Sequence, residues 1–247
     1  MCKDCGCSIN SHTHDYDNKH HMYDNPSFKE KKTLEVLSTI LSKNEHQAAH
    51  NRKHFNEAKV LCINLMSSPG SGKTTLLEAT IKALKNELNI AVIEGDLETN
   101  NDEKRIRQAG AKAYQITTGQ SCHLDAFMIH KALHHLDIKD CDLLFIENVG
   151  NLVCPASYDL GEHLNVVLLS STEGSDKPQK YPVMFRKADV VLITKSDVAQ
   201  HFDFNFEEAT SLVKELNPRA DILFVDSKNG TNIQLWYKFL RLKKELF

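Results

Sequence analysis

The fold of this chain is decided by the stretch Leu61-Cys62-Ile63-Asn64-Leu65-Met66-Ser67-Ser68-Pro69-Gly70-Ser71-Gly72-Lys73-Thr74-Thr75. Its first six residues are mostly apolar and predict a buried strand, and a glycine-rich turn follows directly. Gly70 and Gly72 allow the backbone to curl so that its N–H groups surround phosphate oxygens. A helix that begins near Thr74 adds its positive N-terminal dipole. Strand, turn and helix in this order are the context that a phosphate-binding loop requires.

The loop residues have distinct expected roles. Lys73 is expected to contact the β- and γ-phosphates of a nucleotide, and the Thr74 hydroxyl is expected to bind Mg²⁺. The residues expected to surround the phosphates are Gly70, Ser71, Gly72, Lys73, Thr74 and Thr75. Ser67 stands where such a loop usually begins with glycine, so we expect an altered turn and a retained site. A simple Gly/Ser turn is the alternative, and Gly-Lys-Thr in this context argues against it.

Strands and helices alternate along the chain from Val60 onward, and several predicted strands are apolar throughout. The predicted strands are Leu61–Met66, Ala91–Gly95, Ala113–Thr117, Leu143–Glu147, Val166–Ser170, Val190–Thr194 and Ile222–Val225. The predicted helices lie near residues 74–88, 101–109, 123–136, 179–187, 206–216 and 231–245. This alternation predicts an α/β fold with a doubly wound, mostly parallel sheet that binds ligands at the carboxyl ends of its strands.

One further helix is expected over about residues 29–58, before the first strand. Its apolar residues recur at helical spacing and share one face: Leu34, Leu37, Leu41, Ala48 and Phe55. The helix is expected to pack on the main domain. We therefore expect a domain over residues 33–247 that includes this helix.

Composition restricts the function classes. The chain has 247 residues, 30 basic and 33 acidic side chains, and a formal net charge of −3. A dedicated nucleic-acid binder would carry a basic surplus, so that class is excluded. No apolar run approaches the roughly 20 residues of a membrane-spanning helix, and the N-terminus lacks a signal-peptide core. We expect a cytoplasmic protein whose cysteines are thiols or metal ligands.

Residues 1–32 are rich in metal-binding side chains and poor in large apolar ones. The residues that offer ligands there are Cys2, Cys5, Cys7, His12, His14, His20 and His21. Such a segment cannot bury enough apolar surface to offset its ordering entropy, so we expect a flexible tail. Thiolates select Ni²⁺, Zn²⁺ or Cu⁺, and both square-planar Ni²⁺ and tetrahedral Zn²⁺ suit the three cysteines. Incidental thiols in an unstructured tail are the alternative.

Two segments near the carboxyl ends of later strands indicate a guanine nucleotide. Thr194-Lys195-Ser196-Asp197 resembles the Asn-Lys-x-Asp motif of GTPases, with Thr194 in place of asparagine. The Asp197 carboxylate can accept hydrogen bonds from N1–H and the 2-amino group of guanine, and the Lys195 stem can lie along the base. Asp226-Ser227-Lys228 resembles the loop that brings backbone amides near guanine O6. A solvated pair at a strand end is the alternative for Lys195 and Asp197.

Carboxylates at two other strand ends are expected near the phosphates. Glu147-Asn148-Val149-Gly150 resembles the Asp-x-x-Gly switch of GTPases, with Glu147 reaching Mg²⁺ and the Gly150 N–H sensing the γ-phosphate. Asp96 and Asp102 can each reach the metal or an attacking water. Capping of the helix near 101–109 is the alternative for both, and Asp96 is preferred as the functional residue.

A second group of metal ligands lies within the domain. Cys122 and His123 are expected to begin a helix, whose N-terminus would favour the thiolate, and Cys154 follows Gly150 by four residues. Both segments begin at carboxyl ends of strands, so we expect the three side chains to meet on the nucleotide side. Three ligands are an incomplete set, which water or a partner subunit can complete. Separate core and surface roles are the alternative.

The remaining cysteines and histidines are assigned more modest roles. His163 is an outside candidate for a metal ligand, and Cys62 is expected in the core. Surface or packing roles are expected for Cys141, His130, His134 and His135. The spacing of His130 and His134 suits a metal on a helix, but the sequence places no thiol or carboxylate to join them.

Taken together, these motifs resemble the HypB family of hydrogenase nickel-incorporation GTPases, over nearly the whole chain. Besides the phosphate loop, they are Cys-x-x-Cys-Gly-Cys, Glu-Gly-Asp-x-x-Thr-x-x-Asp, Thr-Gly-x-x-Cys-His-Leu, Glu-Asn-Val-Gly-Asn-Leu-Val-Cys-Pro and Glu-Gly-x-Asp-Lys-Pro-x-Lys-Tyr-Pro. The resemblance implies a P-loop NTPase of the signal-recognition-particle and MinD-like class. The Cys-Pro-His motif of the related urease GTPase is absent.

The resemblance also implies an activity, ligands and partners. Such a protein hydrolyses GTP to GDP slowly, dimerises with nucleotide, and helps deliver Ni²⁺ to the hydrogenase large subunit with a nickel- and zinc-binding accessory protein. Cys122, His123 and Cys154 would then hold Ni²⁺ or Zn²⁺, and Cys2, Cys5 and Cys7 would form a high-affinity nickel site. Two other functions fit parts of the sequence. A small-molecule kinase is opposed by Lys195 and Asp197, and a metal-storage protein leaves the nucleotide motifs unexplained.

Overall fold

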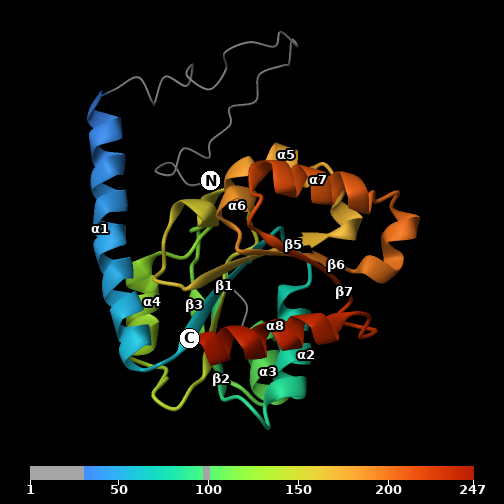
Figure 1. The fold of residues 1–247 in the computed structure, drawn as a ribbon. Helices are drawn as coiled ribbons and strands as arrows, with labels where there is room; N and C mark the ends of the chain where they lie inside the picture. Colours follow the sequence, from blue (N-terminus) through green and yellow to red (C-terminus); the bar gives the residue numbers. More distant parts are fainter. Residues whose placement is uncertain (1–30, 97–100) are drawn as a thin grey trace.

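A computed structural model describes residues 31–96 and 101–247 of the chain. Cys2, Cys5 and Cys7, and the predicted tail as a whole up to residue 30, lie outside these residues. A seven-stranded sheet with the order β3-β2-β4-β1-β5-β6-β7 forms the centre, and every neighbouring pair is parallel (Figure 1). The predicted doubly wound parallel sheet is therefore confirmed. Within the described ranges, no helix is both long and apolar enough to cross a membrane.

The elements follow one another as the sequence predicts. The strands are β1 (Leu61–Ser67), β2 (Ile90–Asp96), β3 (Lys112–Thr117), β4 (Leu143–Glu147), β5 (Leu164–Ser170), β6 (Val190–Thr194) and β7 (Asp221–Val225). The α-helices are α1 (Lys31–Glu57), α2 (Lys73–Leu84), α3 (Asn101–Ala109), α4 (Ala126–Leu133), α5 (Lys177–Lys180), α6 (Pro182–Lys187), α7 (Phe206–Leu216) and α8 (Ile233–Leu246). All seven predicted strands are confirmed to within two residues at each end.

Three predicted helices have different bounds in the structure. The helix expected over 74–88 is α2, which ends four residues earlier, at Leu84. The helix expected over 123–136 is α4, which begins only at Ala126, because the Asp125 side chain caps it by accepting from Met128 N–H at 2.7 Å. The helix expected over 179–187 is two short helices, α5 and α6, divided at Tyr181. Pro182 explains the division, since proline has no N–H to donate and disfavours helical backbone in the residue before it.

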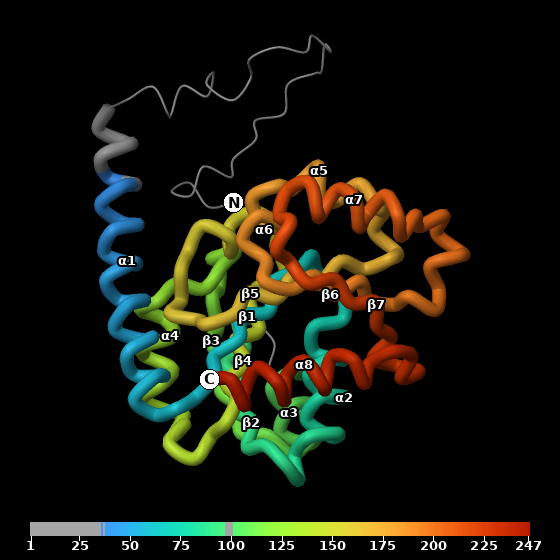
Figure 2. Tube along the Cα trace, viewed as in Figure 1, coloured from blue at the N-terminus to red at the C-terminus, as the bar shows by residue number. Residues whose placement is uncertain are grey.

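The sheet is covered on both faces, and β1 contributes side chains to both. Leu61, Ile63 and Leu65 pack with α2, α3 and α8, while Cys62 packs on the opposite face with α1 and α4. Helices α6 and α7 cover the second half of that opposite face. The continuous tube in Figure 2 shows α1 running beside α4, on the far side of the sheet from α8. Cys62 therefore has the core role that the sequence predicts.

Helix α1 packs on the domain through its buried face. Ala48 and Phe55 are fully buried, as predicted, and Leu41 lies at the exposed edge; the side chains of residues 31–35 and 37 are outside the described set. Gly161, which has a φ of +95°, lies directly under the helix, and a Cβ there would come within 2.6 Å of the Ala48 carbonyl oxygen. The helix and the loop that follows Cys154 are thus in backbone contact.

His163 has a structural role, and its assignment as a possible metal ligand is wrong. Its Nδ1 accepts a hydrogen bond from the Cys62 backbone N–H at 2.9 Å, so Nδ1 carries no proton and Nε2 can donate to Asn56 Oδ1 at 3.0 Å. Both ring nitrogens are used, and neither is left for a metal. Burial, and secondarily the Arg52 charge, lowers the pKa of His163 from 6.5 to about 4.

This histidine predicts a loss of stability in mild acid. The unfolded chain protonates His163 below pH 6.5 while the folded chain keeps it neutral down to about pH 4. Its contribution to stability is therefore complete above pH 6.5 and is lost as the pH falls from 6.5 to 4, with an uptake of about one proton on unfolding. Urea unfolding across this range is expected to show a flatter pH dependence for His163→Gln than for the parent protein. The exposed His201→Gln variant is the control, and parallel curves for His163→Gln and the parent would contradict the assignment.

Candidate nucleotide and metal site

The phosphate loop lies between β1 and α2, at the carboxyl edge of the sheet. Gly70 and Gly72 have φ values of +74° and +96°, a left-handed conformation that favours glycine. Lys73 is buried at the start of α2, where burial lowers its pKa, and its Nζ donates to Ser67 Oγ at 3.0 Å. Ser67, which replaces the usual glycine, thus holds the lysine that is expected to contact phosphates.

A cavity of about 400 Å³ opens beside this loop. Its lining includes the predicted residues Lys73, Thr74, Asp96, Glu147 and Gly150. Gly150 packs so closely on the loop that a Cβ would lie 2.8 Å from Pro69 Cα. The segment that follows β4 is therefore held directly against the phosphate loop.

Two buried carboxylates from neighbouring strands face the cavity. Glu147 Oε1 accepts from Thr74 Oγ1 at 2.8 Å, and Glu94 lies opposite Glu147 in the register of β2 and β4. One oxygen of each, Oε2, is buried without a hydrogen-bond partner in the described part of the chain. Burial raises the pKa of Glu147 to about 7, and burial with the Glu147 charge raises that of Glu94 to about 8. Such orphaned oxygens beside a threonine hydroxyl fit Mg²⁺, which prefers oxygen ligands.

Glu94, missed in the sequence, and the predicted Asp96 both come from β2, and both line the cavity. Glu94 precedes Asp96 by two residues, and the register with Glu147 was the information that could have identified it. Asp102 also lines the cavity. Arg105 forms two ion pairs there, one with Asp102 at 2.7 Å and one with Glu78 at 2.7 Å. Arg105 is the second residue that the sequence reasoning missed, and it places a cation near the phosphate loop.

A second cavity of about 350 Å³ adjoins the other side of the loop. It is lined by three kinds of residue: Ser71, Gly72 and Thr75 of the loop, the expected base-site residues Thr194, Lys195, Asp197, Asp226, Ser227 and Lys228, and in addition Asn229. Thr194 Oγ1 donates to the Ser71 carbonyl at 2.8 Å, and Lys195 Nζ donates to the Gly70 carbonyl at 2.9 Å. The end of β6 is thus attached to the phosphate loop, which places the two cavities side by side.

Asp197 is positioned from a neighbouring loop. Its Oδ2 accepts from Asn229 Nδ2 at 2.7 Å. Asp226, at the end of β7, accepts from the backbone N–H groups of Lys228 and Asn229 and so shapes that loop. The Asp197 carboxylate can therefore face a guanine base while an amide holds its orientation. Asn229 is a further residue that the sequence analysis did not identify.

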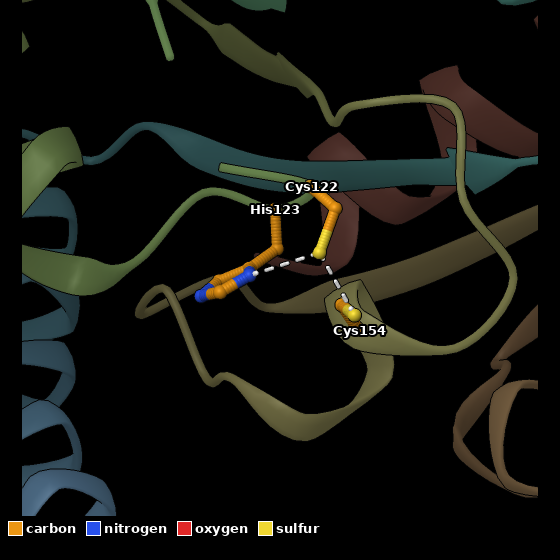
Figure 3. Close-up of side chains that lie close together, drawn as sticks. All are labelled: Cys122, His123 and Cys154. Carbon is orange, nitrogen blue, oxygen red and sulfur yellow. Dashed lines mark hydrogen bonds between the residues drawn. The ribbon is translucent and has the colours of Figure 1, made fainter. Parts of the chain in front are cut away.

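The three predicted metal ligands of the domain meet at one point (Figure 3). The Sγ atoms of Cys122 and Cys154 are 3.0 Å apart, longer than a disulfide bond, and Cys122 Sγ lies 3.8 Å from His123 Nδ1. Burial lowers the pKa of His123, which keeps its ring neutral as a ligand must be. Tyr158 stacks on that ring at 3.9 Å between centroids. Two thiols and an imidazole suit a borderline ion such as Ni²⁺ or Zn²⁺.

Cys122 does not begin a helix, contrary to the prediction. It lies in the loop before α4, four residues ahead of the first helical residue, Ala126. Helix capping by Asp125 accounts for the difference. Cys154 begins a short 3-10 helix, Cys154–Ser157, four residues beyond Gly150. The metal ligands and the phosphate loop are thus connected by one short segment.

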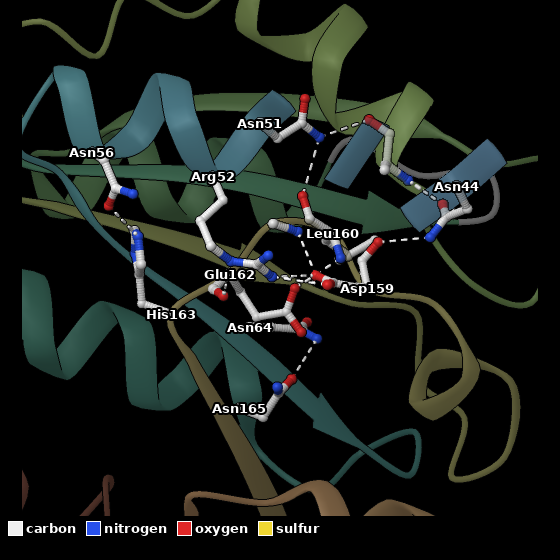
Figure 4. Close-up of polar contacts among 12 residues, drawn as sticks. Asn44, Asn51, Arg52, Asn56, Asn64, Asp159, Leu160, Glu162, His163 and Asn165 are labelled. Carbon is white, nitrogen blue, oxygen red and sulfur yellow. Dashed lines mark hydrogen bonds and ion pairs between the residues drawn. The ribbon is translucent and has the colours of Figure 1, made fainter. Parts of the chain in front are cut away.

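Helix α1 joins the two loops that carry these ligands (Figure 4). Asn44 accepts from Ala126 N–H at 2.9 Å and donates to the Asp159 carbonyl at 2.8 Å. Asn51 donates to the carbonyls of Ala126 and Leu160, at 2.8 and 3.1 Å. Both asparagines are buried, and each bridges the segment after His123 to the segment after Cys154. Their position on the face of Ala48 was the only sequence feature that could have identified them.

These features define a class of protein, the P-loop GTPases: a phosphate loop, a base cavity with an aspartate, and buried carboxylates at the edge of a parallel sheet. The sequence profile of the family described as "CobW/HypB/UreG, nucleotide-binding domain" matches residues 61–224. The chain is 49% identical over 217 residues to hydrogenase maturation factor HypB of Rhizobium leguminosarum bv. viciae, covering 88% of this chain and 73% of that protein. It is 46% identical to HypB of Escherichia coli K12 over 219 residues, covering 89% and 76%. The chain belongs to the CobW/HypB/UreG family, and within it to the HypB hydrogenase maturation factors.

Solved structures agree with this placement. HypB from Helicobacter pylori in complex with nickel superposes with a TM-score of 0.79 at 44% identity, covering 82% of this chain and 95% of that one. HypB from Archaeoglobus fulgidus gives a TM-score of 0.78 at 43% identity, covering 83% and 100%. FlhF complexed with GMPPNP/Mg²⁺ gives 0.50 at 17% identity, covering 75% and 74%, a likeness of fold alone. The resemblance found in the sequence is confirmed.

The asparagine bridge leads to the first prediction for the site. Asn51→Ala leaves the carbonyls of Ala126 and Leu160 without their donor, which is expected to cost about 2 kcal/mol of stability. It also loosens the two ligand loops, so Zn²⁺ affinity at Cys122, His123 and Cys154 is expected to fall about tenfold. Competition with a chromophoric chelator measures this, with Cys2, Cys5 and Cys7 replaced by serine. Lys53→Ala, on the exposed side of α1, is the control. Unchanged affinity in folded Asn51→Ala protein would refute the bridge.

The second prediction concerns the base cavity. Asp197→Asn replaces a carboxylate that can accept two hydrogen bonds from a guanine base by an amide that cannot accept both. GTP affinity is expected to fall by about 100-fold or more, and XTP, whose C2 carbonyl accepts from the new amide, is expected to bind better than GTP. Nucleotide competition measured by fluorescence tests this, with the exposed Asp203→Asn as the control. An unaltered GTP preference over XTP would show that Asp197 does not contact the base.

Proposed function

We propose that the protein is a GTP-hydrolysing metallochaperone that delivers nickel to the large subunit of a [NiFe]-hydrogenase, with GTP-dependent dimerisation coupled to metal binding. The names of its relatives support the role in hydrogenase maturation, and the nickel complex of the Helicobacter pylori protein supports the cargo. The proposal rests on the contacts that one continuous segment makes at its two ends. Residues 147–154 contact the phosphate loop at one end and hold a metal ligand at the other.

The coupling acts through this segment. Glu147 is bonded to Thr74, Gly150 lies against Pro69, and Cys154 lies beside Cys122. A γ-phosphate that contacts the Gly150 N–H fixes the first half of the segment, and the tether of four residues passes that restraint to Cys154. A change in the distance from Cys154 to Cys122 alters the affinity for metal. By linkage, bound metal must alter the affinity for GTP by the same factor.

GTP is held and hydrolysed by residues of the first cavity. Lys73, Thr74 and the backbone N–H groups of residues 70–75 bind the phosphates, and Lys195, Asp197, Ser227 and Lys228 select guanine. Thr74, Asp96 and Glu147, together with Glu94, would hold Mg²⁺, which supplies charge neutralisation at the phosphates when bound. Hydrolysis to GDP removes the restraint on Gly150 and resets the metal site. Slow intrinsic turnover is expected of a GTPase that lacks a well-placed catalytic group.

The metal site is shared between subunits in this proposal. Cys122, His123 and Cys154 supply three donors, while Ni²⁺ and Zn²⁺ commonly take four or more. A second copy of the chain supplies the remaining ligands in the GTP-bound dimer. Cys2, Cys5 and Cys7 form a separate high-affinity nickel site in the N-terminal segment, ahead of the GTPase domain of residues 33–247. A nickel- and zinc-binding accessory protein and the hydrogenase large subunit are the partners, in the cytoplasm.

A nickel titration of the reduced full-length protein tests the coupling. It is made without nucleotide, with GDP and with GTPγS, while thiolate-to-nickel absorption and oligomeric state are followed together. We expect GTPγS to shift the nickel affinity of the domain site by about tenfold and to favour the dimer. Replacing Cys2, Cys5 and Cys7 by serine should leave this shift in place, because the tail is not part of it.

Matched cysteine variants locate the effect. Cys154→Ser should abolish the nucleotide-dependent shift in nickel affinity. Cys141→Ser should retain it, since Cys141 is buried in the hydrophobic core between the sheet and helices α1 and α4. Identical nickel affinity in all three nucleotide states would refute the coupling. The protein would then be a metal holder attached to an independent GTPase.

A further inference from the structure

Three histidines from two helices gather on the surface of the domain. His130 lies in α4 and His134 directly follows that helix, while His50 lies on the exposed side of α1. The ring centroids of His50 and His130 are 5.3 Å apart, and those of His130 and His134 are 4.9 Å apart. We call these residues the α1–α4 histidine cluster. The sequence offered only the pair on α4, and the fold supplies a third imidazole from α1.

The spacing of the rings is that of ligands around one ion. A metal–nitrogen bond of about 2.0–2.1 Å places an imidazole centroid about 3.2 Å from the metal. Two imidazoles on one tetrahedral or octahedral ion then have centroids about 4.5–5.2 Å apart. The two centroid distances in the cluster, 4.9 and 5.3 Å, are close to this spacing, and rotation of the side chains would turn the ring nitrogens toward one ion. His50 and His134 are exposed, so a cation can reach the cluster from solvent.

Protonation of the central ring, His130, is disfavoured in this setting. Partial burial lowers the pKa of His130, and His134, His50 and His54 lower it further. A lowered pKa favours the neutral form of the His130 ring, which is the form that binds a metal. His46, His50 and His54 follow one another at intervals of four residues on the exposed side of α1, so imidazole donors continue along the helix.

We propose that the α1–α4 histidine cluster is a second metal site of the domain, which binds a borderline divalent cation through imidazole nitrogens and joins α1 to α4. Imidazole donors suit Ni²⁺, Cu²⁺ and Zn²⁺, and water completes the coordination. The cluster has no thiolate, so it holds the ion more weakly than Cys122, His123 and Cys154 and exchanges it more readily. Asn51, next to His50, bonds the Ala126 carbonyl at the start of α4, so the cation strengthens a contact that the fold already makes.

Residue-resolved chemical labelling tests occupancy in the full-length protein. Diethylpyrocarbonate modifies neutral exposed imidazoles, and peptide mass spectrometry reads each histidine separately. We expect Ni²⁺, added beyond the capacity of the cysteine sites, to lower the labelling of His50 and His134 several-fold. His135 and His201, exposed histidines outside the cluster, should be labelled equally with and without Ni²⁺, and Mg²⁺ should protect none of the four. Unchanged labelling of His50 and His134 with Ni²⁺ would overturn the proposal.

A double-mutant cycle tests whether one ion bridges the helices. Ni²⁺ should raise the thermal unfolding midpoint of the parent protein more than that of His50→Gln or His130→Gln, and the double variant should lose little beyond either single one. His135→Gln should keep the full rise. If His50→Gln, at an exposed position, also keeps the full rise, the proposed bridge does not exist. The cluster requires no nucleotide, so this failure would leave the coupling of GTP to Cys154 untouched.

Discussion

The hydrogen bond of 2.8 Å between Thr74 Oγ1 and Glu147 Oε1 joins the two halves of the nucleotide site, and much of the remaining arrangement depends on it. It connects the first turn of α2 to the end of β4, and both lie at the carboxyl edge of one parallel sheet. With β4 held there, Gly150 must pass Pro69 with no space for a Cβ, and the chain then delivers Cys154 to Cys122 after only four more residues. Metal and nucleotide sites are neighbours because this connection is short.

Helix α1 imposes a second restraint on the metal ligands, from outside the sheet. Asn44 and Asn51 bond to Ala126 on one side and to residues 159 and 160 on the other. The Arg52 guanidinium adds an ion pair of 2.7 Å with Asp159. Helix α1 therefore fixes the loops that hold His123 and Cys154 relative to each other. The contacts among Cys122, His123 and Cys154 add to this restraint. A change in the position of α1 would be transmitted to the metal site.

The sequence was sufficient wherever function depends on local order along the chain. The strands, the phosphate loop and the Lys195–Asp197 segment were all predicted, because apolar runs and glycines act on their immediate neighbours. Glu94, Asn229 and Asn51 were missed, since each meets a residue more than 30 positions away that only the folded chain brings near, through strand register for Glu94 and through helix or loop packing for the other two. Cys122 was given a helix N-terminus because the capping strength of Asp125 was not recognised. Cys122, His123 and Cys154 nevertheless lie together, as their residue types predicted.

The charged side chains that line the phosphate cavity determine which form of the nucleotide it suits. Glu94 and Glu147 are almost fully buried side by side, and their pKa values of about 8 and 7 express the free energy of holding two carboxylates away from water. Lys73 and Arg105 oppose only part of this charge, and a triphosphate would add more of the same sign. A divalent cation bound with the phosphates offsets the negative charge of the carboxylates and of the phosphates together. The cavity is therefore suited to a metal–nucleotide complex and poorly suited to free GTP. Loss of the γ-phosphate weakens that balance at Glu147, the residue from which the segment to Cys154 begins.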